Sequence, residues 1–486
     1  MKKNTLRFLS VVMSAVTAFT FAGFTAPTTV KAAGETVAIN ATNFPDEEFR
    51  NAVSANLDTD KNGSLSESEL AALTDLSIYY QSWEQSEPYF DSSQWGTSLY
   101  LYNTSDATGI EYFTNVSSLC LSSVINTNID LTKMTNLNYL YVEYCSELTS
   151  LKLDGLNNLS SINIYSCSNL QTLDLTKNPN LGYFDAEWCE SLQSIDTTGL
   201  SELYSISVDN CYNFKSLDVS TNPMVYYVSC AANYNFSSFK TGKNNKNLSS
   251  VYVYGPSLKS LDLSKLSSLQ YLALCDCDIN LNKIGIKNKN KIQGLYIRNN
   301  KKSGFVPSEY KNLYELEYSE NGAKSIDLSK NKKLQMLNLR DNSLKSIDVS
   351  GLKKLWSLDV SANKLSKLDV TKNKNLGILY FNNNGIKNID LSKNKSLYEI
   401  NAYSNVLMDK LDLSKCKFIY SLWIDKDLKI TLPKDSYTIN YYNYNADKSI
   451  TKKLKKTTFS GQGLGVEGWV TFTGKKGHYI EAYLAY

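Results

Sequence analysis

Hydrophobic positions recur at a fixed interval through the middle and later parts of the chain. Four consecutive segments, starting at Leu334, Leu355, Leu376 and Leu397, lie 21 positions apart and share the pattern L-x-x-L-x-L-x-x-N. The alternating apolar positions predict a short strand whose alternate side chains point inward. The asparagine falls where the chain leaves that strand, so its amide can bond backbone groups that no neighbouring strand reaches.

A second apolar triplet follows the asparagine in each period, and we expect it to line the convex side of the same coil: Ile347–Val349, Leu368–Val370, Ile389–Leu391 and Leu411–Leu413. One coil cannot bury its own apolar face, so the pattern predicts that neighbouring coils stack into a solenoid. About fifteen repeats are expected, with a spacing mostly of 22 and later of 21, starting at Val116, Leu137, Leu159, Leu181, Leu203, Val225, Leu248, Leu269, Ile292, Leu313, Leu334, Leu355, Leu376, Leu397 and Phe418.

The chain begins with a pattern typical of a secretory signal peptide, predicted over residues 1–32. Lys2, Lys3 and Arg7 precede an apolar run from Phe8 to about Phe24, and small residues around Ala32 suit cleavage. A membrane anchor is the alternative, but the run is short for a bilayer span. We therefore expect a mature protein that is secreted or held at the cell surface, with no membrane span after cleavage.

Residues 33–77 predict two helices around a calcium loop. The first helix runs from Asp46 to about Ala55 and the second through Leu73. The intervening segment fits the EF-hand-like pattern D-x-[DN]-x-[DN]-G-x5-E at every position. Its expected oxygen ligands are Asp58, Asp60, Asn62, the carbonyl of Ser64, Ser66 and a bidentate Glu69. The alternative is a turn that only resembles a ligand loop.

Two further segments depart from the repeat pattern. Residues 78–115 are unusually aromatic and predict either a binding loop or a flap that covers the end of the core; they include Tyr79, Tyr80, Trp83, Tyr89, Phe90, Trp95, Tyr100 and Tyr102. The solenoid is expected over residues 116–432. Residues 433–486 lose the rhythm and predict a small β cap or module, with a hairpin around Gly474-Lys-Lys-Gly477.

Positions 3, 5, 7 and 8 of each repeat are expected to point out of the concave sheet. In the early repeats these positions form an aromatic and acidic set that we predict to bind a protein or glycan ligand: Tyr139, Tyr141, Glu143, Tyr144, Tyr165, Tyr183, Asp185, Glu187, Trp188, Asp209, Tyr227, Tyr252, Tyr254 and Tyr271. The alternative is that the tyrosines form cross-strand ladders that only stabilise the sheet.

Charge is distributed unevenly along the chain. Residues 34–236 carry 6 Lys and Arg against 26 Asp and Glu, a net charge of −20, whereas residues 237–486 carry 41 against 22, a net charge of +19. The difference could be compositional drift. Otherwise it predicts that the basic half adheres to an anionic cell-wall polymer, so that the chain is a structural surface spacer. Nucleic acid is not expected as a partner of an exposed protein.

Cysteine and histidine usage limits the chemistry. Cys145, Cys167, Cys189 and Cys211 lie 22 positions apart, and Cys277 occupies the same slot, which is the asparagine position of the pattern. Stacked coils would allow a disulfide ladder, but the slot is interior and favours free buried thiols. The single histidine, His478, leaves no Ser/His/Asp triad and no zinc set. We do not expect an enzyme.

Three features resemble a known group of proteins: the lead-in Ile39–Arg50, the calcium-like loop, and the later Gly109-Ile-Glu-Tyr-Phe-Thr-Asn115. Together with the L-D-L-S-x-N repeats they resemble secreted leucine-rich-repeat proteins of Gram-positive gut bacteria and, more distantly, the internalins. The resemblance spans about Ile39 to Lys426. It implies a leucine-rich-repeat solenoid, a right-handed horseshoe of 21–22-residue coils with a parallel concave sheet. It also implies a helical cap, a monomer and a displayed binding face.

Overall fold

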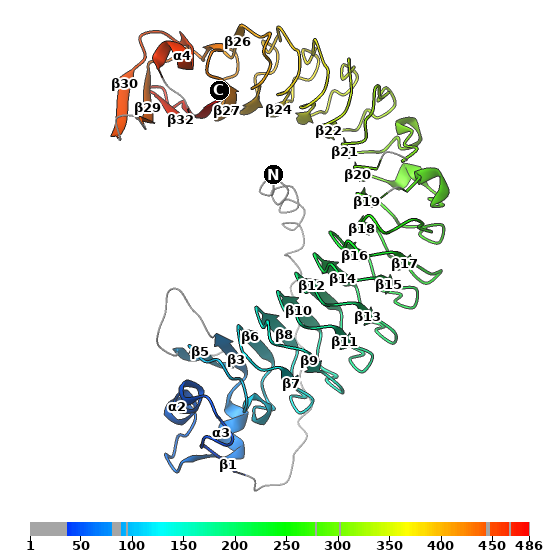
Figure 1. The fold of residues 1–486 in the computed structure, drawn as a ribbon, viewed down its shortest axis with the longest axis vertical. Coiled ribbons are helices and arrows are strands. Elements are labelled where there is room, and N and C mark those ends of the chain that lie inside the picture. Colours follow the sequence, from blue (N-terminus) through cyan, green and yellow to red (C-terminus); the bar gives the residue numbers. More distant parts are fainter. Residues whose placement is uncertain are drawn as a thin grey trace.

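The computed structural model describes residues 36–79, 89–93, 96–277, 279–300, 303–443, 448–465 and 468–485. These residues form a curved solenoid with one long sheet on its inner, concave side and loops and short strands on its outer side (Figure 1). The fold is therefore the expected leucine-rich-repeat solenoid, of about 15 turns. The expected signal peptide, residues 1–32, lies outside the described residues. Within the described ranges no helix is long and apolar enough to cross a membrane.

The concave sheet contains one strand from each coil, and each strand pairs in parallel with the next. The pairing Tyr139↔Ser161↔Tyr183 shows the register, in which equivalent repeat positions face each other. The strands in spatial order are β3 Asp75–Tyr79, β6 Ser118–Ser122, β8 Tyr139–Glu143, β10 Ser161–Tyr165, β12 Tyr183–Glu187, β14 Ser205–Asp209, β16 Tyr227–Cys230, β18 Ser250–Tyr254, β19 Tyr271–Cys275, β20 Gly294–Arg298, β21 Glu315–Ser319, β22 Met336–Asn338, β23 Ser357–Asp359, β24 Ile378–Tyr380, β25 Glu399–Asn401 and β27 Ser421–Asp425.

Shorter strands lie on the outer side of the early coils, where the second apolar triplet was expected. They pair in parallel within two groups and comprise β7 Asn128–Asp130, β9 Ser150–Lys152, β11 Thr172–Asp174, β13 Ser194–Asp196, β15 Ser216–Asp218 and β17 Ser238–Lys240. The triplets of the later coils turn their apolar residues into the core too, as at Leu368 and Val370. Short 3-10 turns complete the coils: η2 Ile110–Tyr112, η3 Leu281–Lys283, η4 Lys289–Lys291 and η5 Pro307–Glu309.

The N-terminal end of the sheet is covered by helices and by a hairpin. Helix α2 (Glu47–Asn56) and helix α3 (Glu67–Ala72) flank a small sheet of β1 (Val37–Ala38) and β2 (Ser64–Leu65). Asp46 caps α2, and its other carboxylate oxygen accepts a hydrogen bond from the backbone N–H of Ser105 at 2.9 Å. β4 (Tyr89–Ser93) and β5 (Gly96–Tyr102) form an antiparallel hairpin whose β5 extends the sheet beside β3.

Gly109, at the start of the Gly-Ile-Glu-Tyr-Phe segment, stands where only glycine fits. Its φ is +110°, and a Cβ there would lie 2.4 Å from the Phe44 ring. Phe44 in turn contacts Phe49 and Phe113, with ring centroids 5.4 and 6.2 Å apart. Glycine at this one position thus lets the helical cap close over the first coil.

The C-terminal end of the sheet is closed by a strand from the end of the chain. β33 (Tyr479–Ala485) pairs in parallel with β27 and antiparallel with β32 (Gly468–Gly474), which gives the expected hairpin around Gly474-Lys-Lys-Gly477. β29 (Tyr437–Asn443) and β30 (Lys448–Lys453) continue the sheet, and the outer side ends with β26 Lys410–Asp412, β28 Lys429–Thr431, β31 Thr458–Phe459 and α4 Gly461–Leu464.

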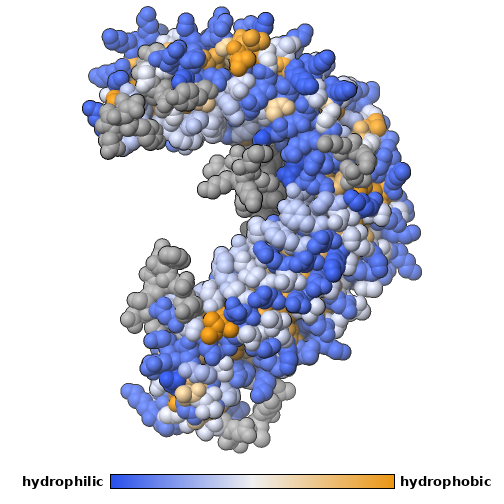
Figure 2. Space-filling view, viewed as in Figure 1, coloured by the Kyte–Doolittle hydropathy of each residue, from blue (hydrophilic) through white to orange (hydrophobic). Residues whose placement is uncertain are grey.

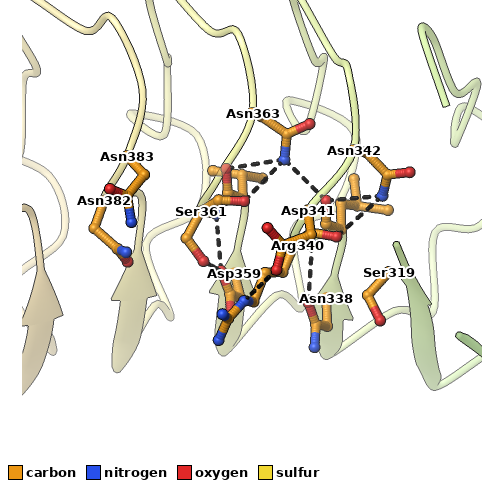
Figure 3. A network of polar contacts seen from close by, with 12 residues as sticks. Ser319, Asn338, Arg340, Asp341, Asn342, Asp359, Ser361, Asn363, Asn382 and Asn383 are labelled. Carbon is orange, nitrogen blue, oxygen red and sulfur yellow. Dashed lines mark hydrogen bonds and ion pairs between the residues drawn. The ribbon is translucent and has the colours of Figure 1, made fainter. Parts of the chain in front are cut away.

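Buried asparagines bind the backbone from coil to coil, as the pattern predicts. Asn363 donates from Nδ2 to the carbonyl of Leu339 at 2.9 Å (Figure 3). Its Oδ1 accepts the N–H of Leu344 at 3.0 Å. A second set of buried asparagines, the last residue of the L-D-L-S-x-N repeats, lies before the strands of several coils. There Asn373 donates to the carbonyls of Val349 and Leu352 at 2.9 and 2.8 Å. Both sets satisfy backbone groups that would otherwise be buried without partners.

In the early coils cysteine stands at the asparagine position that follows the strand, the last position of L-x-x-L-x-L-x-x-N. All nine cysteines are free thiols in this structure, and those of the column are buried, as the interior slot requires. The sulfur of Cys167 lies 3.8 Å from the carbonyl of Val142 in the preceding coil. In a later coil the same slot holds Asn233, whose Nδ2 donates to the equivalent carbonyl, that of Val208. The thiol therefore fills the slot of an amide with a small, mainly apolar group.

Two details of the repeat alignment are wrong. The last repeat starts at Ile419 and not at Phe418, because Glu399 pairs with Ser421, Ile419 is buried and Phe418 is 68% exposed. In addition, position 8 is not a strand position. It has a positive φ in nearly every coil, as at Tyr144 (+54°) and Trp188 (+60°), so these side chains lie in a left-handed bend at the edge of the sheet.

Candidate functional site

The concave sheet of the early coils carries an alternation of large and small side chains at repeat position 3. The aligned residues are Ser118, Tyr139, Ser161, Tyr183, Ser205, Tyr227, Ser250, Tyr271 and Gly294. A tyrosine in every second coil leaves its ring room over the serine of the next coil, since adjacent strands are only about 4.8 Å apart. At Gly294 a Cβ would lie 2.5 Å from the Tyr271 ring, so glycine provides that room here.

None of the fourteen residues predicted to bind a ligand is buried in the core. Tyr139, Tyr141 and Tyr144 are 50%, 38% and 52% exposed, and the other eleven are partly exposed. Figure 2 shows pale, weakly hydrophilic side chains along the inner arc beside the early coils. The early face is therefore accessible, as a binding face requires.

The alternative use of the tyrosines, as ladders that stabilise the sheet, also has support. Tyr144 packs edge-on against Tyr165 at 5.3 Å, and Tyr227 lies 5.5 Å from Tyr252. Tyr254 is covered on one face by the guanidinium of Arg298 at 5.1 Å. These contacts fix the ring positions, and they leave Tyr139 and Tyr141 as the most exposed of the predicted tyrosines on the early strands.

Two further aromatic columns border this face, and of their members the sequence prediction included only Trp188. Tyr204 and Tyr226 stack at 6.0 Å with rings nearly parallel, before the strands β14 and β16. On the opposite edge Trp188, Tyr212 and Tyr234 form a chain of ring contacts at 6.2 and 5.2 Å. The signal is present in the sequence, because each pair of tyrosines is 22 positions apart.

Three carboxylates lie together inside this aromatic border. Asp185 and Glu187 are on β12, and Asp209 is directly opposite Glu187 on β14. Their hydrogen-bond donors are neutral: Tyr183 to Asp185 at 3.3 Å, Trp188 to Glu187 at 3.1 Å, and Ser229 to Asp209 at 2.8 Å. Like charges directly opposite each other on a sheet repel, so this cluster favours the approach of a cation.

The pKa values of these three carboxyl groups are raised, which shows that their ionised forms are unfavourable in the folded chain. Burial, followed by the charges of Asp209 and Glu187, raises the pKa of Asp185 to about 7. Burial and then Asp209 raise the pKa of Glu187, and burial raises that of Asp209 against the hydrogen bonds from Ala231, Ser229 and Ser207. No lysine or arginine of the described residues contributes to these shifts. Among the residues that the structure describes, the cluster has no positive partner.

The later coils differ, because their carboxylates have basic neighbours. Arg298 lies 3.5 Å from Asp276, and Arg340 binds Asp341 at 2.7 Å (Figure 3). Asp359, one coil further, accepts the backbone N–H of Ser361 at 2.8 Å. This mixed surface is electrically more balanced than the early face.

The EF-hand-like loop places its carboxylates together. Asp58, Asp60 and Glu69 present oxygens that all lie within 4.8 Å of one another. A calcium ion with Ca–O distances of about 2.3–2.6 Å can bridge oxygens so placed. Gly63, at φ +81°, allows the turn, and its N–H donates to Asp58 at 3.0 Å. Hydrogen bonds from Ser66, then Thr59, lower the pKa of Glu69 to about 2, so this ligand is ionised at neutral pH.

The remaining expected ligands occupy the positions that the pattern assigns. Asn62 donates from Nδ2 to Asp60 at 2.8 Å, and Ser66 donates from Oγ to Glu69 at 2.7 Å. Ser64 begins β2, which pairs with β1 and thereby holds the second half of the loop. The donor set, of hard oxygens only, has the chemistry that calcium prefers.

Comparisons with known proteins agree with the solenoid. The family model "At1g61320/AtMIF1, LRR domain" matches residues 98–238. The functional domain of InlJ from Listeria monocytogenes, described as including a cysteine ladder, is 22% identical, with a TM-score of 0.58 over 93% of this chain and 99% of its own. No curated protein matches the chain in sequence.

Two other solved structures are similar over a smaller share. The internalin InlF of Listeria monocytogenes is 19% identical over 75% of this chain and 97% of its own, with a TM-score of 0.41. A leucine-rich-repeat protein of Leptospira interrogans is 18% identical over 66% and 80%, with a TM-score of 0.40. At such identities a structural likeness concerns the fold alone.

The raised pKa of Asp185 gives a test of the acidic cluster. Because its ordinary pKa is 3.8 and its folded pKa is about 7, the chain takes up a proton on folding between these values, and stability is lost as pH rises through this window. The substitution Asp185→Asn removes the titrating carboxyl group and with it this loss of stability at high pH. We expect it to raise the free energy of unfolding by about 1–2 kcal/mol at pH 8, and to change it little below pH 4.

Urea unfolding at the two pH values measures this difference. Asp174→Asn is the matched control, because hydrogen bonds from Thr176 lower the pKa of Asp174, so its substitution is expected to destabilise at pH 8. A loss of stability in Asp185→Asn at pH 8 would contradict a repulsive cluster.

Proposed function

We propose that this chain is a binding protein of the extracellular space that recognises a protein or glycan ligand through its concave sheet. The observation that carries the proposal is the cluster of Asp185, Glu187 and Asp209, which is partly buried among exposed tyrosines without a basic partner of its own. A buried charge that lacks a partner is costly, so a ligand that supplies the missing cation gains from pairing with it. The cluster favours a basic protein surface over a neutral glycan.

The aromatic border supports the same proposal. Tyrosine and tryptophan side chains with few rotatable bonds lose little entropy on binding, and they dominate the energetics of most protein interfaces. Tyr139 and Tyr141 lie on the open sheet, while the stacked Tyr204 and Tyr226 hold one edge of it rigid. Recognition by a rigid face does not require the solenoid to change shape.

Secretion belongs to the proposal and rests on the sequence. Basic residues, an apolar run and small residues follow one another within residues 1–32. An acidic cluster of this kind would then face an extracellular ligand. No catalytic step is assigned to the concave face.

Replacing Tyr141, Tyr183 and Trp188 together with alanine tests the concave face. Because interface aromatics each contribute about 1–3 kcal/mol, we expect capture from an array of purified extracellular proteins and glycans to weaken at least about 100-fold. The matched control replaces Tyr314, Trp356 and Tyr398, two tyrosines and a tryptophan on the side of the later coils, and should capture normally. Equal capture by both variants would leave the chain as a structural spacer.

A calcium ion bound by the EF-hand-like loop is the second part of the proposal. It is supported by the converging oxygens of Asp58, Asp60 and Glu69. The helices that this loop joins cover the first coil, so a bound ion would stabilise the cap.

Calorimetric titration with calcium measures this site. We expect one binding event per chain, an increase in the melting temperature of the cap, and an affinity at least about tenfold lower after Asp58→Ala. Glu67→Gln is the matched control, since Glu67 is an acidic residue of α3 outside the ligand pattern. If the Asp58→Ala variant binds calcium as tightly as the unchanged chain, the calcium site does not lie in this loop.

Retention on an anionic cell-wall polymer is the second candidate function, and one specific observation favours it. Six consecutive later coils each expose a lysine two positions before the repeat start: Lys311, Lys332, Lys353, Lys374, Lys395 and Lys417. In a stack with a coil spacing of about 4.8 Å, such a column concentrates positive charge along one line. A polymer with regularly spaced phosphates could neutralise it.

Binding to purified poly(glycerol phosphate) tests this column. Replacing Lys332, Lys353 and Lys374 with glutamine should weaken retention about tenfold and reduce its dependence on salt, because exposed charges are screened beyond about 8 Å at physiological ionic strength. Replacing Lys152, Lys177 and Lys215 removes the same charge from the acidic half and should have little effect. Equal losses would indicate net charge rather than a site.

A further inference from the structure

The C-terminal end of the concave sheet carries a second aromatic group, in a part of the molecule that the early face does not reach. Trp423 on β27 is aligned with Tyr483 on β33, and Tyr483 with Trp469 on β32. Their neighbours along the strands, Leu422 and Leu484 among them, point into the core. The three rings therefore share the concave face, although about sixty residues separate the first from the last.

These rings line a pocket. It has a volume of about 330 Å³, and Tyr403 and Ala485 complete its wall. Trp469 is 56% and Tyr483 is 38% exposed, which are high values for such large side chains placed side by side. Monomeric proteins seldom expose a cluster of this kind unless it binds something.

The rings do not form one flat platform. Trp469 is inclined by 74° to Trp423 and by 61° to Tyr483, with centroids 6.3 and 5.4 Å apart. A sugar stacks best on a single flat ring. Rings at steep angles instead direct several electron-rich faces toward one space, and this is how proteins bind an alkylated ammonium ion.

The charge around the pocket has the complementary sign. Asp425 follows Trp423 by two residues on the same face, and Glu481 precedes Tyr483 by two. Both accept hydrogen bonds from neutral donors, Asp425 from the N–H of Ser404 at 2.8 Å and Glu481 from the hydroxyl of Tyr479 at 3.0 Å. The facing positions of the described strands β23, β24, β25, β27 and β33 contain no lysine or arginine. The strand positions that face the pocket are acidic, although Lys426 follows Asp425 directly and this half of the chain is basic.

We propose that Trp423, Trp469, Tyr483 and Tyr403 form a binding site for an alkylated ammonium group, such as a trimethylammonium carried on a ligand without a neighbouring phosphate. The rings would contact the methyl groups and the positive charge together. Asp425 and Glu481 would add attraction from either side, and they would disfavour a phosphate beside the cation. The site is independent of the early concave face, which lies many coils away (Figure 1).

Choline and its neutral isostere 3,3-dimethylbutan-1-ol separate charge from shape. In saturation-transfer NMR and tryptophan-fluorescence titrations of the full chain, we expect choline to bind saturably in the millimolar range, at least about fivefold more tightly than the isostere. Phosphocholine should bind more weakly than choline. Methyl glucoside should not compete.

Variants locate the effect. Trp469→Ala should weaken choline binding about tenfold, and Trp469→Phe should retain part of it, because a smaller ring remains. Trp469 is exposed, so neither change is expected to disturb folding. Trp356→Ala is the matched control, since Trp356 is 40% exposed on another surface. Glu481→Gln should weaken choline and leave the isostere unchanged.

Four results would overturn the proposal. Equal affinity for choline and the isostere would show an apolar pocket without preference for a cation. Tighter binding of methyl glucoside would show a sugar site. Choline binding that survives Trp469→Ala would place the ammonium site elsewhere. The absence of saturable binding up to about 50 mM, a range that covers the weakest cation–π sites, would show that no ammonium site exists here.

Discussion

The structure depends on how each coil leaves its strand. A chain that turns sharply beside a stack of leucines brings several N–H and C=O groups into the core, where water cannot reach them. The buried asparagines solve this by bonding two backbone groups of the preceding coil, as Asn363 does with the carbonyl of Leu339 and the N–H of Leu344. Where such an asparagine is present it binds its coil to the preceding one, and the parallel pairing of the strands fixes the coil spacing throughout the array. All positions of the concave face then have a constant register.

The constant register explains why each repeat position lies either in the core or on the surface in successive coils. Inward positions hold leucine, valine or isoleucine in coil after coil, so variation is confined to the outward ones. In the first half these carry tyrosine and carboxylate, and in the second half lysine is placed on the side of the coils rather than on the sheet. The concave face is thus acidic and aromatic at both ends even though the net charges of the two halves are opposite. The lysine column and the proposed recognition faces therefore lie on different surfaces of the coils.

Much of the fold could be predicted from the sequence, because its signal repeats. The spacing of leucines identifies the strands, the apolar triplets identify the outer side, and the asparagine slot identifies an interior position where cysteine is a free thiol. The left-handed bend at position 8 could not be read, because Tyr144, Trp188 and Ala362 stand there without a glycine to mark it. At the last repeat two adjacent apolar residues, Phe418 and Ile419, offered alternative registers, and only strand pairing chooses between them.

The candidate sites were less predictable because they depend on which strands become neighbours. The tyrosines of the early face follow from periodicity, but the acidic cluster gains its character from the pairing of β12 with β14. The C-terminal aromatic pocket requires β33 to join β27 across an intervening segment without repeats. No local pattern encodes that contact.

The alternation of tyrosine and a small residue has a consequence for how such a protein can change in length. Tyr139, Tyr183, Tyr227 and Tyr271 are each 44 positions apart, so the inner surface repeats every two coils although the backbone repeats every one. Losing or duplicating a single coil would bring two tyrosine rings, or two serines, face to face. Within the early coils, from Ser118 to Gly294, the inner surface is therefore built in pairs, and adding or removing two coils at once preserves the alternation.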